Sequence, residues 1–338
     1  MTTSPAPHPG ARRRIHPAWW VAAVAFLALF AAAGFRAAPG ALMVPLHHKF
    51  GWSTSIMSLA VSVNLLLYGL VSPFAAALMD RFGMRRVIAI ALTLVALGAG
   101  GSVLMTASWQ RLVFWGLLIG AGTGSMALVL AATISNRWFV ARRGLVMGVL
   151  TAGSATGQLV ILPPVASLAE NVGWRAASLV IAAVALAAVP LVLAVIRDHP
   201  EDRGVLPFGA DPATYVAPPR AHGGAMQRAL EGLSVAVRHR AIWALALAFA
   251  ICGATTNGLI GIHFIPSAHD HGMATTTAAG LLAAVGVFDI LGTIASGWLT
   301  DTFDPRKLLA IYYTFRGVSL VLLPLLLAET VNPRSCCS

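Results

Sequence analysis

Three charged side chains interrupt long apolar segments of this chain: Arg36, Asp289 and Arg316. An arginine inside membrane hydrocarbon costs about 2.5 to 3.5 kcal/mol on insertion scales, so each charge is expected to face a cavity or a partner. A guanidinium in a cavity can bind a carboxylate, and an aspartate beside it can change its protonation. These residue types predict a site for a small organic anion, with Asp289 as the proton-coupling group.

Simpler interpretations stay open for each charge. Arg36 could reach the outer membrane surface along its aliphatic stem, and Asp289 and Arg316 could merely neutralise each other. Asp289 and Arg316 lie about 11 and 8 residues from the inner ends of their segments, which at 1.5 Å per residue is a similar depth. The two are therefore expected to pair.

A short charged segment occurs twice. Residues 78–86, LMDRFGMRR, recur 221 positions later as residues 299–307, LTDTFDPRK, which indicates a duplication. Each copy separates two long apolar runs, so each is predicted to be a tight turn between two membrane helices. An aspartate there can cap the next helix or pair with an arginine, and Asp80 is expected to bond the next helix's amides or Arg137. The predicted gate motif comprises Asp80, Arg81, Gly83, Arg85, Arg86, Asp301 and Arg306.

The 221-residue offset also relates polar residues inside the apolar segments. Arg36 corresponds to Asn257, and Tyr68 corresponds to Asp289. Under the alternative interpretation, these are polar groups that help helices pack. The predicted substrate path is lined by Arg36, Asn257, Tyr68, His263 and Arg316.

Membrane-spanning helices must position these residues. Of 338 residues, 58% are apolar and 10% charged, against about 25% charged in soluble domains. Nine segments are long enough to cross about 30 Å of hydrocarbon. They predict an all-α bundle with a six-helix half, residues 19–196, and an incomplete three-helix half, residues 241–328. The predicted spans are 19–46, 54–79, 87–106, 110–135, 144–168, 174–196, 241–266, 274–300 and 308–328.

The basic excess follows the membrane topology. With a cytoplasmic N-terminal segment, residues 1–18, inside segments hold 17 of the 23 Lys and Arg residues, and the other six lie in outside segments or in spans. This bias accounts for the net charge of +11 without a nucleic-acid partner. Residues 197–240, Pro-rich and then amphipathic, are predicted to be a cytoplasmic linker. We expect a multi-pass protein of the plasma (inner) membrane whose partners are the lipid bilayer and a small organic anion.

Other features favour close helix packing and argue against catalysis. Glycines at four-residue spacing, Gly116, Gly120 and Gly124, let helix backbones approach, as do Gly153 and Gly157. The sequence has no phosphate-binding glycine loop, no HExxH motif and no acidic pair within the spans. Neither an enzyme nor a cofactor is therefore expected. A metal site is not expected either, because a polar outer loop explains His263, His269 and His271.

Two related halves, repeated charged turns and a long central linker resemble the major facilitator superfamily. The similarity extends over residues 15 to 328 and points to the branch of monocarboxylate and oxalate/formate-type transporters. It is carried by GFRAAPGALMVPL, FGWSTSIMSLAVSVNLLLYGLVSPFAAALMDRFG, NRWFVARRGLVMGVLTAGSATGQ and SGWLTD. The resemblance implies secondary transport by alternating access, coupled to protons or to a counter-anion.

The chain also departs from that pattern. Ala76 stands where the first turn motif usually opens with glycine, whereas Gly297 keeps it. Thr293 stands where eukaryotic monocarboxylate carriers have an arginine, and Arg316 is a candidate replacement. Nine spans instead of twelve, followed by residues 329–338 as an aberrant tail, suggest a truncated product. A membrane remnant without transport, or a regulatory or interaction protein, is therefore the alternative to an active carrier.

Overall fold

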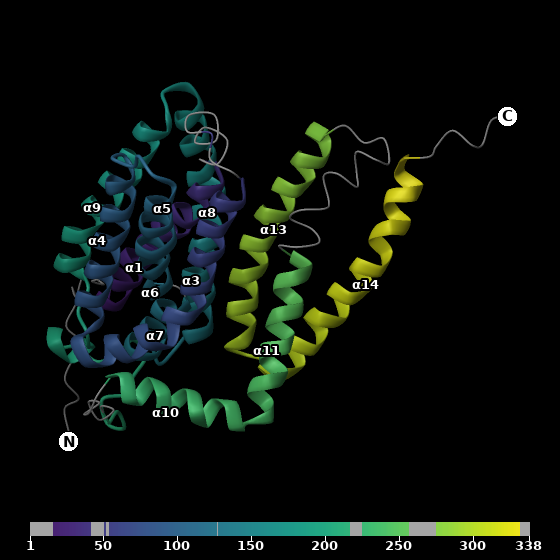
Figure 1. Ribbon diagram of the computed structural model, residues 1–338. Helices are drawn as coiled ribbons and strands as arrows, with labels where there is room; N and C mark the ends of the chain where they lie inside the picture. Colours follow the sequence, from purple (N-terminus) through teal and green to yellow (C-terminus); the bar gives the residue numbers. More distant parts are fainter. Residues whose placement is uncertain are drawn as a thin grey trace, which may run out of the picture.

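The computed structural model describes residues 16–41, 51, 54–126, 128–216, 225–256 and 275–331. This part of the chain is almost entirely helical, as predicted, with one isolated bridge between Phe139 and Phe208. The helices in Figure 1 are α1 (Pro17–Ala41), α3 (Thr54–Phe82), α4 (Met84–Ser102), α5 (Ser108–Arg111), the π-helix η1 (Leu112–Ile119), α6 (Gly120–Met126), α7 (Leu128–Trp138), α8 (Arg143–Asn171), α9 (Trp174–Val195), the 3-10 helix η2 (Pro200–Arg203), α10 (Ala225–Arg238), α11 (Arg240–Gly253), α13 (Thr275–Thr300) and α14 (Pro305–Val331).

Six helical spans within the described residues are long and apolar enough to cross a membrane. The pair α10 and α11 adds a seventh if counted as one span, although the two helices meet at 93°. A shorter apolar stretch, Ala284–Thr300, lies in α13. The fourth candidate span, Ser108–Trp138, comprises α5, η1, α6 and α7, and the described part of each predicted span contains a helix.

The duplication is visible in the helix boundaries. Thr54 begins α3 and Thr275 begins α13, and these two residues lie 221 positions apart. Met84 and Pro305, which begin α4 and α14, have the same separation. The offset read from the charged turns therefore also describes where the helices start.

The first charged turn is shorter than predicted. The predicted spans end at residue 79 and resume at 87, but α3 runs to Phe82 and α4 starts at Met84. Only Gly83 separates the two helices, with φ at 90°, a value that glycine adopts without the strain of a Cβ. Asp80 and Arg81 therefore belong to the last turn of α3.

The predicted glycine seams bring helices into close contact. A Cβ added at Gly120 would lie 3.0 Å from the Cα of Asn64, and one at Gly124 would lie 2.8 Å from the Cα of Tyr68. Gly116 faces α3 in the same way, and Gly153 and Gly157 face α1. Small residues thus fix α3 against η1 and α6, and α8 against α1.

The π-helix in the fourth span is stabilised from α3. A π-helix disturbs the regular backbone pairing of an α-helix and is often found at functional sites. Here the buried side-chain amide of Asn64 donates to the carbonyl of Trp115 at 2.8 Å. The contact supplies a donor to a main-chain oxygen that is buried away from water.

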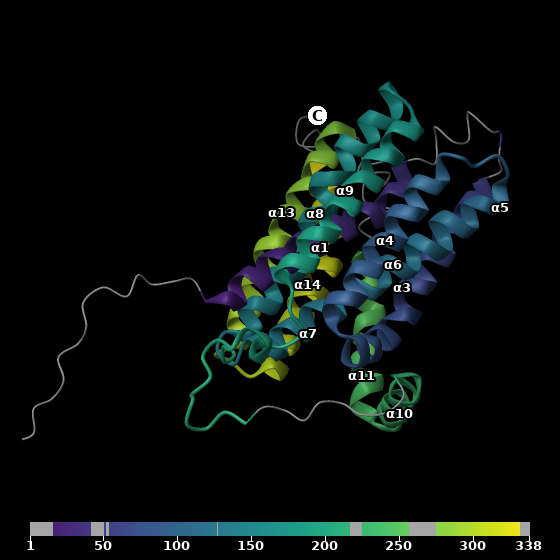
Figure 2. The ribbon, with the colours of Figure 1, turned by 90° about the vertical axis from the view of Figure 1, so that its left-hand side faces the viewer.

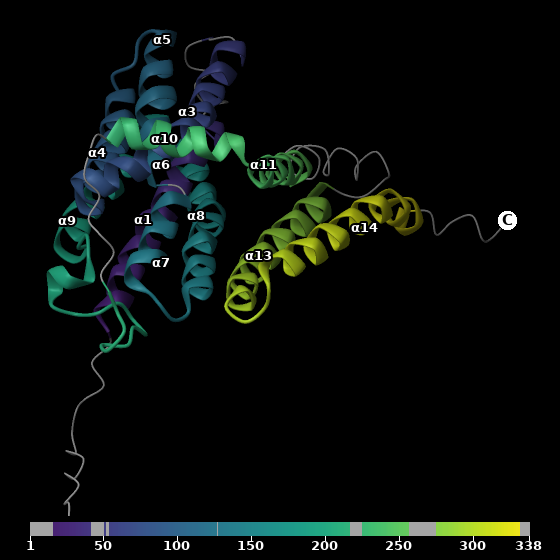
Figure 3. The ribbon, with the colours of Figure 1, turned by 90° about the horizontal axis from the view of Figure 1, so that it is seen from below.

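The helices form two groups in Figure 1. One contains α1 and α3 to α9; the other contains α11, α13 and α14, with α13 packed along α8. From the turn that joins them, α13 and α14 diverge. Figure 3 shows α10 crossing beneath the first group, and Figure 2 shows residues 197–216 on the same side. We call the side that carries residues 197–216 and α10 the linker face.

Candidate functional site

Arg36 points into the first helical group. Its guanidinium lies over the ring of Tyr68, 4.5 Å from the ring centroid, which is a cation–π contact. Tyr68 is 14 residues from each end of α3, and is therefore at the middle of that helix. Arg36 thus reaches toward the centre of the bundle rather than toward the outer surface.

The guanidinium of Arg36 borders a small cavity of about 10 Å³, enough for about one water molecule. Thr123 and Ser154 supply hydroxyl groups to its wall. Thr123 is 15 residues from both Ser108 and Trp138, the ends of the fourth span, so the cavity also lies midway along that span. Four helices contribute to the lining, which comprises Leu29, Ala32, Ala33, Arg36, Tyr68, Thr123 and Ser154.

The remaining predicted path residues are not gathered around this cavity. Asn257 and His263 lie outside the described residues, as do His269 and His271. Asp289 lies near the middle of α13 and is exposed. No cluster of three or more potential metal ligands occurs among the residues described.

The predicted pairing of Asp289 with Arg316 is wrong. Arg316 instead donates to α11 and the turn after it: to the Thr255 hydroxyl from Nε at 2.9 Å, to the Cys252 carbonyl at 3.1 Å, and to the Thr256 hydroxyl. Similar depth did not bring the two charges together, because α13 and α14 diverge above their common turn (Figure 1). Arg316 ties α14 to α11, and the Tyr313 hydroxyl adds a bond to the Ala248 carbonyl at 2.6 Å.

At the linker face, Asp80 pairs with Arg137, which is one of the two partners predicted for it. Arg137 Nη2 lies 2.5 Å from Asp80 Oδ1, and Nη1 donates to the Asp198 carbonyl at 3.4 Å. The other alternative, capping of α4 by Asp80, is not what forms. The Asp198 carboxylate accepts from the Arg85 amide at 2.9 Å and so caps α4. The capping role of Asp198 was not predicted, although a carboxylate just after the sixth apolar segment indicates a possible helix cap on this side.

Gly83→Ala is expected to lower the melting temperature more than Gly173→Ala does. Both glycines precede helices with positive φ, 90° and 122°, so an added Cβ strains both backbones. Only at Gly83 would that Cβ collide with the Asp198 carboxylate, because nothing lies within 4 Å of it at Gly173. Displacing Asp198 removes a helix cap worth about 1 kcal/mol. Thermal unfolding followed by tryptophan fluorescence measures the difference, and equal shifts would reject this role of Asp198.

Asp301 makes the corresponding contact between the two groups of helices. Its carboxylate accepts from the amides of Gly144 and Leu145, at 2.6 and 2.9 Å, at the N-terminus of α8. It therefore caps a helix of the first group and not the next helix, α14. Asp304 caps α14 by accepting from the Arg306 amide at 2.9 Å.

Glycines allow this close approach. A Cβ added to Gly148 would lie 3.0 Å from the Cα of Gly297, and one added to Gly297 would lie 2.7 Å from the Cα of Gly148. We call the Asp301 contacts and this glycine contact the α8–α13 latch. It joins the helix ends at the linker face, which is the arrangement that a closed gate on this side requires.

Three arginines of the predicted gate motif, Arg81, Arg86 and Arg306, lie at the surface. Arg81 stacks over Phe82, with 5.1 Å between its Cζ and the ring centroid. The side chains of Arg86 and Arg306 are exposed, whereas Arg85 is half-buried. The contacts that join separate helices are therefore made by the aspartates, together with Arg137.

Comparisons with known proteins agree with this architecture. The chain is 26% identical to the uncharacterized MFS-type transporter YcxA of Bacillus subtilis, over 91% of this chain and 72% of that protein. It is 30% identical to human monocarboxylate transporter 11, over 89% of this chain and 60% of that protein's length. Its fold matches the proton:xylose symporter XylE of E. coli with a TM-score of 0.56, at 17% identity, over 85% of this chain and 70% of XylE. The model of the Major Facilitator Superfamily matches residues 24–331, and the chain belongs to this family of multi-pass membrane transporters.

Proposed function

We propose that this chain carries small organic anions of the monocarboxylate type across a membrane by alternating access. The observation that carries the proposal is the guanidinium of Arg36, which borders a cavity at the middle of α3 and of the fourth span. A cation in that position needs an anionic partner, and a carboxylate matches the planar fork of an arginine. A relative named as a monocarboxylate transporter supports this substrate class.

In this proposal Arg36 binds the substrate carboxylate from above the ring of Tyr68. The Ser154 hydroxyl offers a further hydrogen bond to the anion, whereas the Thr123 hydroxyl donates to the Ile119 carbonyl at 2.8 Å. Asn257, His263 and Arg316 line the rest of the path in the second half, and Asp289 is the proton-coupling group. A cavity of about 10 Å³ is too small for a bound anion, so the helices around it must separate for binding.

The linker face is the cytoplasmic side in this proposal, with the N-terminal segment and residues 197–240 inside the cell. Residues 19–196 and 241–328 form the two halves that rock against each other. The α8–α13 latch and the Asp80–Arg137 pair close the cytoplasmic side, because they bond helix ends that must part when this side opens. Coupling to protons or to a counter-anion drives the cycle.

Uptake of ¹⁴C-pyruvate into proteoliposomes that contain this chain tests the proposal. We expect uptake above that of empty liposomes, and a change in rate when an inward proton gradient is imposed. Uptake that responds to a counter-anion but not to protons would assign exchange instead of proton coupling. Correctly inserted protein with no uptake would reject transport and favour a membrane protein with an interaction role.

A further inference from the structure

The segment after α9 folds back against the linker face. The Phe208 amide donates to the Trp138 carbonyl at 2.8 Å, and the Phe208 carbonyl accepts from the Val140 amide at 2.9 Å. The ring of Phe208 packs edge-on against Trp19 and His16, with 5.6 Å between centroids in each pair. Residues 199–216, which we call the strap, are therefore fixed to the corner between α7 and α8.

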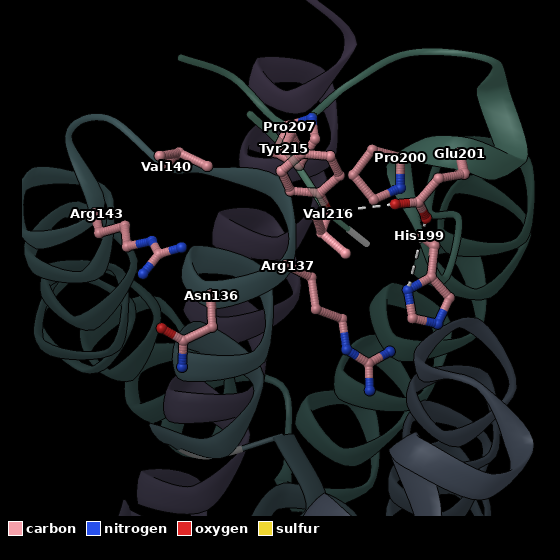
Figure 4. Close-up of a pocket in the computed structure, with 10 residues that line it drawn as sticks. All are labelled: Asn136, Arg137, Val140, Arg143, His199, Pro200, Glu201, Pro207, Tyr215 and Val216. Carbon is pink, nitrogen blue, oxygen red and sulfur yellow. Dashed lines mark hydrogen bonds and ion pairs between the residues drawn. The ribbon is translucent and has the colours of Figure 1, made fainter. Parts of the chain in front are cut away.

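A pocket of about 490 Å³ lies between the strap and this corner (Figure 4). It is far larger than the cavity beside Arg36, and its size falls within the range of about 300–1,000 Å³ typical of small-molecule sites. Its lining joins the end of α7, the start of α8 and the strap. The lining residues are Asn136, Arg137, Val140, Arg143, His199, Pro200, Glu201, Pro207, Tyr215 and Val216.

One side of the pocket is cationic. In Figure 4, Asn136 lies between Arg137 and Arg143. Arg143 donates from Nε to the Phe139 carbonyl at 2.6 Å, and its two terminal nitrogens have no hydrogen-bond partner within the described part of the chain. The Arg137 side chain is 15% exposed and forms an ion pair with Asp80. This side therefore offers donors spread over two guanidinium groups and one amide.

The strap forms the opposite side of the pocket and contributes both polar and apolar side chains to it. The Tyr215 hydroxyl donates to Glu201 Oε1 at 3.3 Å, and His199 Nδ1 lies 4.0 Å from Glu201 Oε2. Burial and the neighbouring Glu201 carboxylate raise the pKa of Tyr215, so its hydroxyl remains a donor at neutral pH. Pro200, Pro207 and Val216 add apolar surface beside the Tyr215 ring.

We propose that this pocket binds an organic phosphate of nucleotide size. The phosphates lie along Arg143, Asn136 and Arg137, because two separated guanidinium groups suit a multiply charged anion. A planar base lies against the Tyr215 ring and the prolines. The Glu201 carboxylate repels the phosphates, and accepts hydrogen bonds from sugar hydroxyls or an exocyclic amine at the other end.

Occupancy of this site couples to the gate. Arg137 is the partner of Asp80, and Arg143 directly precedes the two amides that Asp301 binds. A phosphate that draws on Arg137 competes with Asp80, whereas one held at Arg143 adds negative charge near the N-terminus of α8. The site, with a volume of about 490 Å³, lies on the linker face apart from the Arg36 cavity, and ligand binding there does not depend on which anion is transported.

Isothermal titration of the full chain in phosphatidylcholine nanodiscs, with ADP as the probe and no divalent metal, tests the site. We expect ADP to bind more tightly than adenosine or pyrophosphate, since each of these lacks one half of the contacts. Arg143→Gln should weaken ADP binding at least about tenfold, because it removes charge-assisted hydrogen bonds. Arg142→Gln is the matched control, since it removes the same charge one residue away and outside the lining.

A second variant guards against misfolding at the start of α8. Tyr215→Ala should weaken adenosine binding and leave pyrophosphate binding within about twofold, because only the base contacts the ring. Absence of ADP binding, equal losses in Arg142→Gln and Arg143→Gln, or loss of ADP binding in nanodiscs that also contain phosphatidylglycerol would each overturn the proposal. The last outcome would assign the cationic side to a lipid headgroup.

Discussion

Arg36→Gln is expected to weaken pyruvate binding about a hundredfold, or about 2.7 kcal/mol. The guanidinium is the cation at the Arg36 cavity, and glutamine removes its charge while keeping a shorter polar side chain. Arg36→Lys should lose about tenfold, since an ammonium keeps the charge but neither stacks on Tyr68 as a plane nor binds a carboxylate with two bonds. Scintillation proximity binding of ¹⁴C-pyruvate to the purified chain measures both.

Arg175→Gln is the matched control for this prediction. Arg175 also stacks on an aromatic ring, with 4.9 Å between its Cζ and the ring centroid of Trp174, but it lies at the start of α9. The substitution removes the same charge and the same kind of stacking at a distant position. Equal losses of pyruvate affinity in the two variants would mean that Arg36 acts through overall charge or folding rather than as the binding group.

Asp301→Asn is expected to shift the chain toward a state with the linker face open, by about five- to thirtyfold in population. The carboxylate accepts from two amides at the N-terminus of α8, and a charged cap in this position contributes about 1 to 2 kcal/mol. Asparagine offers only one acceptor oxygen and no charge. Double electron–electron resonance between spin labels at the exposed residues Val140 and Phe303 would measure the distance between the two groups of helices at the linker face.

Asp304→Asn is the control, because Asp304 caps α14 and not α8. It should leave the label distances unchanged. Gly297→Ala should open the linker face as Asp301→Asn does, since its Cβ would press on Gly148, whereas Gly292→Ala in the same helix meets nothing within 4 Å. If Asp301→Asn and Asp304→Asn give the same distance distributions, the carboxylate is a local cap and the latch is refuted.

Much of the fold follows from the sequence. Apolar length and charge bias predict the membrane helices, and the 221-residue offset matches the starts of two helix pairs. Membership of a transporter family also confirms that the chain is not an enzyme. The cost of a charge in an apolar segment indicates Arg36 as a site residue, and the 221-residue offset to Asp289 indicates Tyr68. Their contact with each other was not predicted.

The contacts between helices could not be predicted, since they depend on how each helix is rotated and tilted. Depth along the membrane suggested that Asp289 meets Arg316, but diverging helices separate them (Figure 1). Thr123 and Ser154 each resemble many other hydroxyls in membrane helices until packing brings them beside Arg36. Likewise, a turn motif shows that Asp301 can cap a helix, but not that α8 is the helix it caps.

Competition between pyruvate and its neutral amide tests the central claim most directly. Pyruvamide has nearly the same size and shape as pyruvate but lacks the carboxylate that Arg36 is proposed to bind. In proteoliposomes containing this chain, unlabelled pyruvate should suppress ¹⁴C-pyruvate uptake, whereas pyruvamide should not. Pyruvamide is added at about ten times the pyruvate concentration, so that even an affinity about tenfold weaker than that of pyruvate would be detected. Equal suppression by the acid and the amide would contradict recognition of an anion by this chain.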